Sequence, residues 1–104
     1  MLLSAKPYWI AEPDSKKVDV TATAVVNCEA SGNPAPETFW TRDGVRLVAD
    51  EYKIKFLPVA NSKSGKKDLY IYDFSDEDVG VYQCVSKNSI GSIISSSKLS
   101  IHSE

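Results

Sequence analysis

The sequence predicts an all-β sandwich of two facing antiparallel sheets with Greek-key connections, and three observations support this prediction. Cys28 and Cys84 are separated by more than half of the chain, so a bond between them would join strands of opposite sheets. Trp40 lies at a distance after the first cysteine that lets its ring pack on the sulfurs. Tyr82, two positions before Cys84, matches a corner tyrosine whose hydroxyl bonds to nearby backbone.

Composition indicates one globular domain. The chain has 104 residues and 42% hydrophobic content, enough to fill a single core. A net charge of −2 argues against a general affinity for nucleic acid or anionic membrane. No apolar run approaches the ~20 residues that a membrane-spanning helix needs. We expect residues 1–5 to be a linker or expression remnant, 6–102 the domain, and 103–104 a second linker, since Met1-Leu2-Leu3 is too short for a signal peptide.

Three strands are expected in the first third of the chain. Residues 6–11 form an edge strand, where Pro7 is tolerated because an edge position needs no donor. Val18–Val20 continues on the other sheet. Alternation then predicts a half-buried strand with four inward residues, Ala24, Val26, Cys28 and Ala30. Ser31–Pro36 is predicted to be a loop, because two prolines and a glycine oppose pairing.

The middle of the chain predicts short strands joined by tight turns. Thr38–Arg42 is a strand with Trp40 inward, and Asp43-Gly44 turns it back into Val45–Val48. Tyr52–Leu57 is the next strand, and Asn61–Lys67 is a polar turn.

The last third predicts the remaining strands of the core. Leu69, Ile71 and Phe74 point inward before an acidic turn at 76–78. Val81–Lys87 carries three core-facing residues, which are Tyr82, Cys84 and Ser86. A hairpin at 88–91 leads into Ser92–Ile101, with Leu99 and Ile101 buried.

Together these motifs resemble the I-set class of immunoglobulin domains over nearly the whole chain. The core signature of the resemblance comprises Trp40, Leu69, Asp78, Gly80 and Tyr82. Within that class, the opening Lys6-Pro7-Tyr8-Trp9 is similar to domains of fibroblast growth factor receptors and neural cell-adhesion molecules. The basic stretch that binds heparan sulfate in those receptors is reduced here to Lys16-Lys17.

The two cysteines admit two interpretations. In an oxidising compartment they would form a disulfide, whose loop closure stabilises the fold by about 4 kcal/mol. In the cytosol the same residues would stay reduced and act as small buried hydrophobes. A zinc site is not expected, because there are only two thiols and the one histidine, His102, lies in the tail.

Catalysis and cofactor binding find no support in the sequence. A single tail histidine excludes a histidine-based triad, and the glycines are dispersed among hairpins rather than gathered in a phosphate-binding loop. The acidic run at 76–78 lacks the alternating ligands and glycine of a calcium loop. We expect a solvated turn in which Asp78 pairs with a cation such as Lys53.

Surface recognition is therefore the expected activity. Lys63, Lys66 and Lys67 could contact heparan sulfate or an acidic protein face, or could simply keep a loop soluble. Phe39 should lie on the outer face of its sheet, and Trp9 should pack at an edge or against a neighbouring domain. Tyr8, Ile90, Ile93 and Ile94 are further exposed apolar candidates, and because Ile93 and Ile94 cannot both face inward, one of them lies at a bulge or is available for contact.

The resemblance implies an extracellular, non-catalytic protein-binding module of a multidomain cell-surface adhesion protein or receptor. Its partners would be neighbouring immunoglobulin domains of the same chain and a cell-surface ligand or a second copy, with no membrane insertion. The alternative is an intracellular I-set scaffolding or elastic domain of a giant muscle protein in the sarcomere, which needs no disulfide. A glycan-binding module depends on the lysine turn alone.

Overall fold

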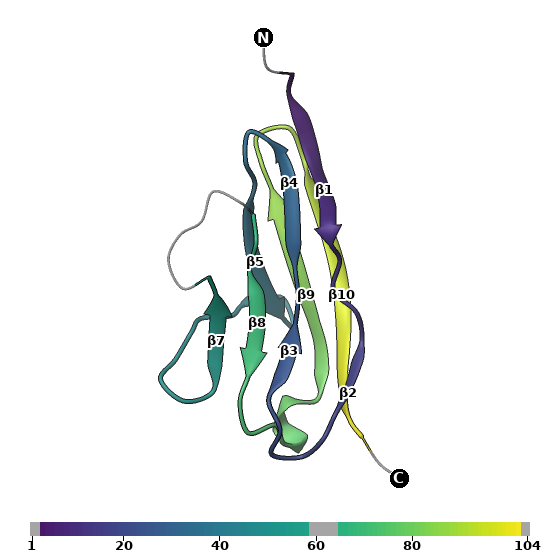
Figure 1. Ribbon diagram of the computed structural model, residues 1–104, viewed down its shortest axis with the longest axis vertical. Coiled ribbons are helices and arrows are strands. Elements are labelled where there is room, and N and C mark those ends of the chain that lie inside the picture. The colour runs from purple at the N-terminus through teal and green to yellow at the C-terminus, as the bar shows by residue number, and fades with distance from the viewer. Residues whose placement is uncertain (1–2, 59–64, 103–104) are drawn as a thin grey trace.

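Ten strands and one short 3-10 helix form the part of the chain that the computed structural model describes, residues 3–58 and 65–102 (Figure 1). Their bounds are β1 Ala5–Ala11, β2 Lys16–Val18, β3 Ala24–Val26, β4 Glu29–Asn33, β5 Glu37–Arg42, β6 Val45–Arg46, β7 Ile54–Leu57, β8 Asp68–Ile71, η1 Asp76–Asp78, β9 Gly80–Lys87 and β10 Ser92–Ile101.

The strands form two layers, which confirms the all-β sandwich. One layer is a five-stranded sheet in the order β2-β10-β9-β5-β6, and the other contains β3-β8-β7 with the β1-β4 pair beyond it. One pair departs from the antiparallel prediction, because β2 runs parallel to β10. The crossing from β1 to β2 enforces this direction: Ser97 Oγ donates to the Asp14 carbonyl at 2.6 Å, and Ser15 Oγ accepts from the Lys98 amide at 2.9 Å.

A disulfide joins the two layers at the centre of the sandwich. Cys28 lies between β3 and β4, Cys84 lies on β9, and their Cα atoms are 6.7 Å apart. Trp40 on β5 pairs with Cys84 across the ladder, and its side chain is fully buried. The indole Nε1 donates to the Lys67 carbonyl at 2.6 Å, so the ring leaves no polar group unsatisfied. The surrounding core includes Val26, Leu69, Ile71, Phe74 and Leu99.

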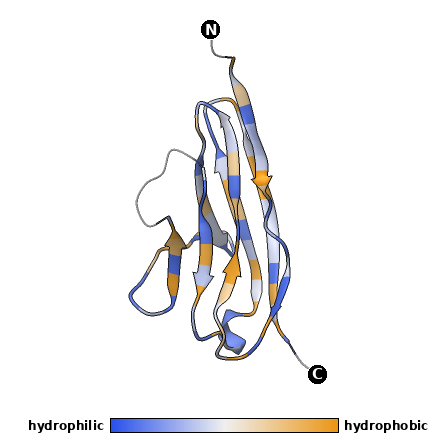
Figure 2. Ribbon diagram, viewed as in Figure 1, coloured by the Kyte–Doolittle hydropathy of each residue, from blue (hydrophilic) through white to orange (hydrophobic). Residues whose placement is uncertain are grey.

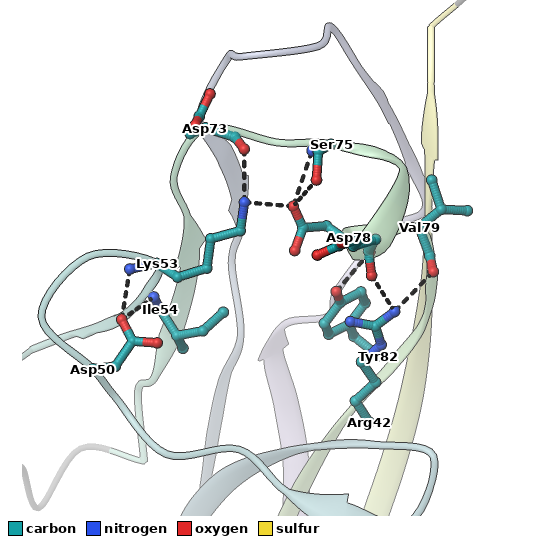
Figure 3. A network of polar contacts seen from close by, with 10 residues as sticks. Arg42, Asp50, Lys53, Ile54, Asp73, Ser75, Asp78, Val79 and Tyr82 are labelled. Carbon is teal, nitrogen blue, oxygen red and sulfur yellow. Dashed lines mark hydrogen bonds and ion pairs between the residues drawn. The ribbon is translucent and has the colours of Figure 1, made fainter.

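The corner tyrosine closes one end of this core. The Tyr82 hydroxyl donates to the Asp78 carbonyl at 2.6 Å, within a buried environment that raises the pKa of the phenol. The Arg42 guanidinium lies 5.1 Å from the centre of the Tyr82 ring and donates to the carbonyls of Glu77 and Val79. Strand β9 therefore leaves the 3-10 helix in a fixed direction (Figure 3).

The acidic turn is less solvated than predicted. Asp76 and Glu77 are exposed, but Asp78 is buried, and its carboxylate binds Lys53 Nζ at 2.6 Å. This is the pairing that the sequence suggested. The carboxylate also accepts from the Ser75 amide, and Lys53 donates to the Asp73 carbonyl (Figure 3). The negative charge of Asp78 can be buried because Lys53 and the Ser75 amide both bind its carboxylate.

The predicted loop at Ser31–Pro36 is wrong in its first half. Ser31, Gly32 and Asn33 belong to β4, which pairs with β1 through Tyr8↔Ser31 and Ala5↔Asn33. Gly32 permits this approach, because a Cβ there would lie 3.2 Å from the Ala5 carbonyl oxygen and 3.3 Å from Pro7 Cα. Glycine often interrupts a strand, whereas Gly32 lets the backbones of β1 and β4 come close.

Several predicted strands are shorter or displaced. The strand expected at Val18–Val20 is Lys16–Val18, those expected at Val45–Val48 and Tyr52–Leu57 shorten to β6 and β7, and Ile101 is half-buried rather than buried. β1 begins at Ala5, one position early. Most of the polar turn at Asn61–Lys67 lies outside the described residues. The end of this turn bonds to the start of β4. The Ala30 amide donates to the Gly65 carbonyl, and the Lys67 amide donates to the Cys28 carbonyl.

Candidate protein-interaction face

Residues 3–58 and 65–102 hold no cluster of metal-binding side chains. No group of three or more His, Cys, Asp or Glu side chains in this part of the chain gathers closely enough to hold a metal ion. His102 pairs its Nδ1 with Asp19 at 3.2 Å on the exposed surface. Among the same residues, no helix is long and apolar enough to cross a membrane.

The outer face of the five-stranded sheet carries an apolar row across three strands. Phe39 on β5 is paired with Val85 on β9, and Val85 is paired with Ile94 on β10, so the three side chains lie side by side. Ile94 is 57% exposed, while Phe39 and Val85 are partly buried. Phe39 thus faces outward as predicted, and it forms one continuous surface with Ile94.

Lys87, paired with Glu37, borders this row on one side, and Arg46, paired with Thr41, reaches it from the other. The Arg46 guanidinium lies 4.4 Å from the centre of the Phe39 ring, and Lys87 Nζ lies 5.6 Å from it. Glu37 is 3.8 Å from Arg46, with both side chains more than half exposed, so the pair is weak. These long side chains shield the aromatic face without closing it.

A polar row lies on the other side. Gln83 accepts from Thr41 Oγ1 at 3.5 Å and donates to Ser96 Oγ at 3.4 Å. The next row pairs exposed Val81 with Lys98. An apolar stripe between cations and amide or hydroxyl groups has the mixed character of a non-obligate protein interface. We name Phe39, Val85 and Ile94, with Arg46 and Lys87, the sheet face.

Sequence reasoning found Phe39 and Ile94 but missed the other three residues of the sheet face. The signal was present: Val85 and Lys87 alternate with the inward residues Cys84 and Ser86, which places them outward. Their neighbourhood with Phe39 and Ile94 depends on the strand order, which the sequence did not reveal.

The structure describes two lysines of the predicted polar turn, Lys66 and Lys67. Lys63 lies outside the described residues. Lys66 Nζ binds the buried carboxylate of Asp68 at 2.8 Å, and this hydrogen bond raises the pKa of Lys66. Lys67 Nζ lies 4.9 Å from the centre of the Phe56 ring. The two described lysines therefore contact different groups, and Lys66 has a structural partner.

Trp9 is less available than an exposed candidate would be. It is half-buried and packs against the central core, and its neighbours Tyr8 and Ile10 are exposed instead. This is the edge-packing alternative, in which the indole seals the sandwich beside β4.

Comparison with known proteins adds a family and a set of relatives. The model of a family described as "Immunoglobulin domain" matches residues 6–88. The chain is 34% identical over 95 residues to Roundabout homolog 1 of Homo sapiens, covering 91% of this chain and 6% of that protein. It is 30% identical over 101 residues to contactin-2 of Homo sapiens, covering 97% of this chain and 9% of that protein. The curated relatives are thus many times longer than this chain.

Solved structures give the same architecture. The titin domain M7 superposes with a TM-score of 0.83 at 31% identity, covering 99% of this chain and 100% of that one.

Proposed function

The chain belongs to the immunoglobulin domain family, and we propose that it serves as a non-catalytic protein-binding module of a multidomain cell-surface adhesion protein or receptor. The sheet face carries this proposal. Its apolar row is exposed at Ile94 and partly exposed at Phe39 and Val85, its strands are fixed by pairing on both sides, and its rim offers cations and hydrogen-bonding groups. Such a surface binds a partner without reorganising its backbone.

The placement of the first and last strands suits an arrangement of domains in a row. β1 begins and β10 ends at opposite poles of a molecule 54 Å long (Figure 1). Successive domains can then follow one another in a row, which leaves the sheet faces at the side of the array. Leu3 and Ile90 are exposed apolar side chains near the first β1 residues and the β9–β10 hairpin, where a preceding domain would pack.

The extracellular location is supported by the resemblance of the opening Lys6-Pro7-Tyr8-Trp9 to receptor and adhesion domains, and by the disulfide, since disulfides persist mainly in oxidising compartments. The similarity to titin domain M7 supports a second candidate, an intracellular I-set domain of a giant muscle protein. Counting thiols in denatured protein from its native compartment separates the two. No reactive thiol is expected, and two would favour the muscle protein.

The sheet face is tested with the domain displayed in several copies and probed against a panel of purified extracellular proteins that includes the domain itself. We expect Ile94→Asp to reduce the affinity of any partner by about tenfold or more, since a charge then replaces a central apolar contact. Tyr8→Asp is the matched control, because Tyr8 is equally exposed on β1. Equal loss in both variants, or none, would contradict the sheet face.

Heparan sulfate is a further candidate partner, for which Lys66 and Lys67 are the described cations. Lys66→Ala with Lys67→Ala should shorten retention on heparin if these residues bind the glycan. The engagement of Lys66 by Asp68 favours a protein partner over this one.

A further inference from the structure

A cleft of about 510 Å³ opens on the side of the sandwich where β6 ends and β7 begins. β6 is the last strand of the five-stranded sheet and β7 the last of the β3-β8-β7 sheet, so the cleft lies between two sheet edges. Its lining includes Arg46, Leu47, Val48, Lys55, Phe56 and Lys67. We name this region the edge cleft.

The floor of the edge cleft is apolar and fixed in place. Leu47 and Phe56 line it and also pack against the central core, and the Leu47 amide donates to the Trp40 carbonyl. Val48 lines it while remaining 75% exposed. Figure 2 shows that β7, beside the cleft, mixes apolar and charged positions. An apolar side chain from a partner would find a preformed surface here.

The rim of the edge cleft is positively charged although the chain carries a net −2. Arg46, Lys55 and Lys67 contribute three positive charges, against one negative charge from Asp50. The Asp50 carboxylate accepts hydrogen bonds from the amides of Lys53, Ile54 and Tyr52, which lower its pKa. One of its oxygens is thus held by its own loop, and Arg46 is paired only loosely, with the exposed Glu37 at 3.8 Å.

We propose that the edge cleft binds an acidic, extended peptide segment of a protein partner. An aliphatic or aromatic side chain of that segment lies on Leu47 and Phe56, and flanking carboxylates pair with the rim cations. An extended shape fits because the cleft runs between two strand edges. A sulfated glycan would match the cations but leave the apolar floor uncovered. The edge cleft shares only Arg46 with the sheet face, so Lys55→Glu tests the cleft alone and this inference survives failure of the proposal made for that face.

The test uses the isotope-labelled domain and a synthetic peptide of six glutamates around one central phenylalanine, followed by amide chemical shifts. We expect shifts concentrated at Leu47, Val48 and Phe56, with a Kd at or below about 1 mM. Arg46→Glu and Lys55→Glu should each weaken binding by about tenfold, because each replaces an attraction by a repulsion. Lys98→Glu is the matched control, because Lys98 is an exposed residue of β10, and it should change Kd less than about twofold.

A second probe separates floor from rim. A peptide in which glycine replaces the phenylalanine should bind about tenfold more weakly to the parent domain. Val48→Asp should have a similar effect, and its exposed position lets the fold persist. The proposal is overturned if the first peptide causes no shifts at about 1 mM, if Lys98→Glu weakens it as much as Lys55→Glu, or if a heparin fragment shifts the cleft residues at lower concentration.

Discussion

The centre of the sandwich and the segment from β6 to β7, residues 45–57, are both rich in large apolar side chains, but only the centre buries them. Trp40 and Leu69 are fully buried, whereas Val48 and Tyr52 are 75% and 84% exposed. Central strands have partners on both sides, while β6 and β7 are the last strands of their sheets. An apolar residue is buried when neighbouring strands cover it, and an edge segment leaves such residues free for recognition.

Polar contacts hold the edge segment where packing does not. The Asp50 carboxylate accepts hydrogen bonds from the Tyr52 and Ile54 amides, and these bonds shape the turn into β7. Lys53 then anchors the turn to the opposite loop through Asp78 and the Asp73 carbonyl (Figure 3). The two regions therefore should respond differently to substitution, and the following predictions exploit this from the largest effect to the smallest.

Removing the central cross-link should have the largest effect. Cys28→Ala with Cys84→Ala should lower the free energy of unfolding by about 4 kcal/mol, because the unfolded chain loses its loop constraint. Urea denaturation followed by tryptophan fluorescence measures this. Chemical reduction of the parent domain is the control and should reproduce most of the loss. A change below about 1 kcal/mol would contradict the central role of the bond.

Neutralising Asp78 should destabilise both regions at once. Asp78→Asn should cost about 2 kcal/mol, because a buried charge-assisted bond is lost and Lys53 keeps its charge without a partner. The double variant with Lys53→Met should recover part of that cost. If the single and double variants unfold at the same urea concentration, the pair contributes no coupling.

Removing the corner hydroxyl should have a smaller effect. Tyr82→Phe should lower stability by about 1 kcal/mol, since the Asp78 carbonyl loses its donor in a buried setting. The variant keeps the ring and hence the core packing. Nuclear magnetic resonance spectra that stay dispersed would show that the fold persists.

The same tyrosine predicts a pH dependence with a definite sign. Burial raises the Tyr82 pKa above its ordinary value of 10.0, so the folded state holds this proton more tightly than the unfolded state. The raised pKa of Lys66 acts in the same direction from its ordinary 10.5. Stability should be fully present below pH 10.0 and decline as pH rises through the folded values. Tyr82→Phe should flatten this decline, and an unchanged slope would contradict the assignment.

The smallest global effect is expected at the edge segment. Asp50→Ala removes the acceptor for the Tyr52, Lys53 and Ile54 amides without opening the core. Amide hydrogen exchange should accelerate at these positions and stay unchanged at Leu69. Glu51→Ala, an exposed neighbouring carboxylate, is the control. Exchange that accelerates equally in both variants would show that Asp50 does not hold the turn.

Most of the core was predictable because alternation reports burial directly. The four residues predicted to face inward do so, namely Ala24, Val26, Cys28 and Ala30. Their strand is nevertheless divided into β3 and β4 at Asn27-Cys28, where the Asp68 carboxylate accepts a hydrogen bond from the Cys28 amide. Boundaries were less predictable: Gly32 continues a strand because Ala5 and Pro7 approach it, and that neighbour is distant in sequence. Whether a glycine ends a strand or continues it can be decided only once the partner strand is known.

The local pattern of the chain thus determined the sandwich, the inward positions of Cys28, Cys84 and Trp40, and the corner tyrosine, because period-two alternation and cysteine spacing are properties of the sequence itself. Tertiary structure alone decided which outward residues become neighbours. Strand order brought Phe39, Val85 and Ile94 into one row, and two sheet edges placed Arg46 beside Lys67 across a cleft. Those groupings depend on contacts between distant segments, which no local pattern encodes.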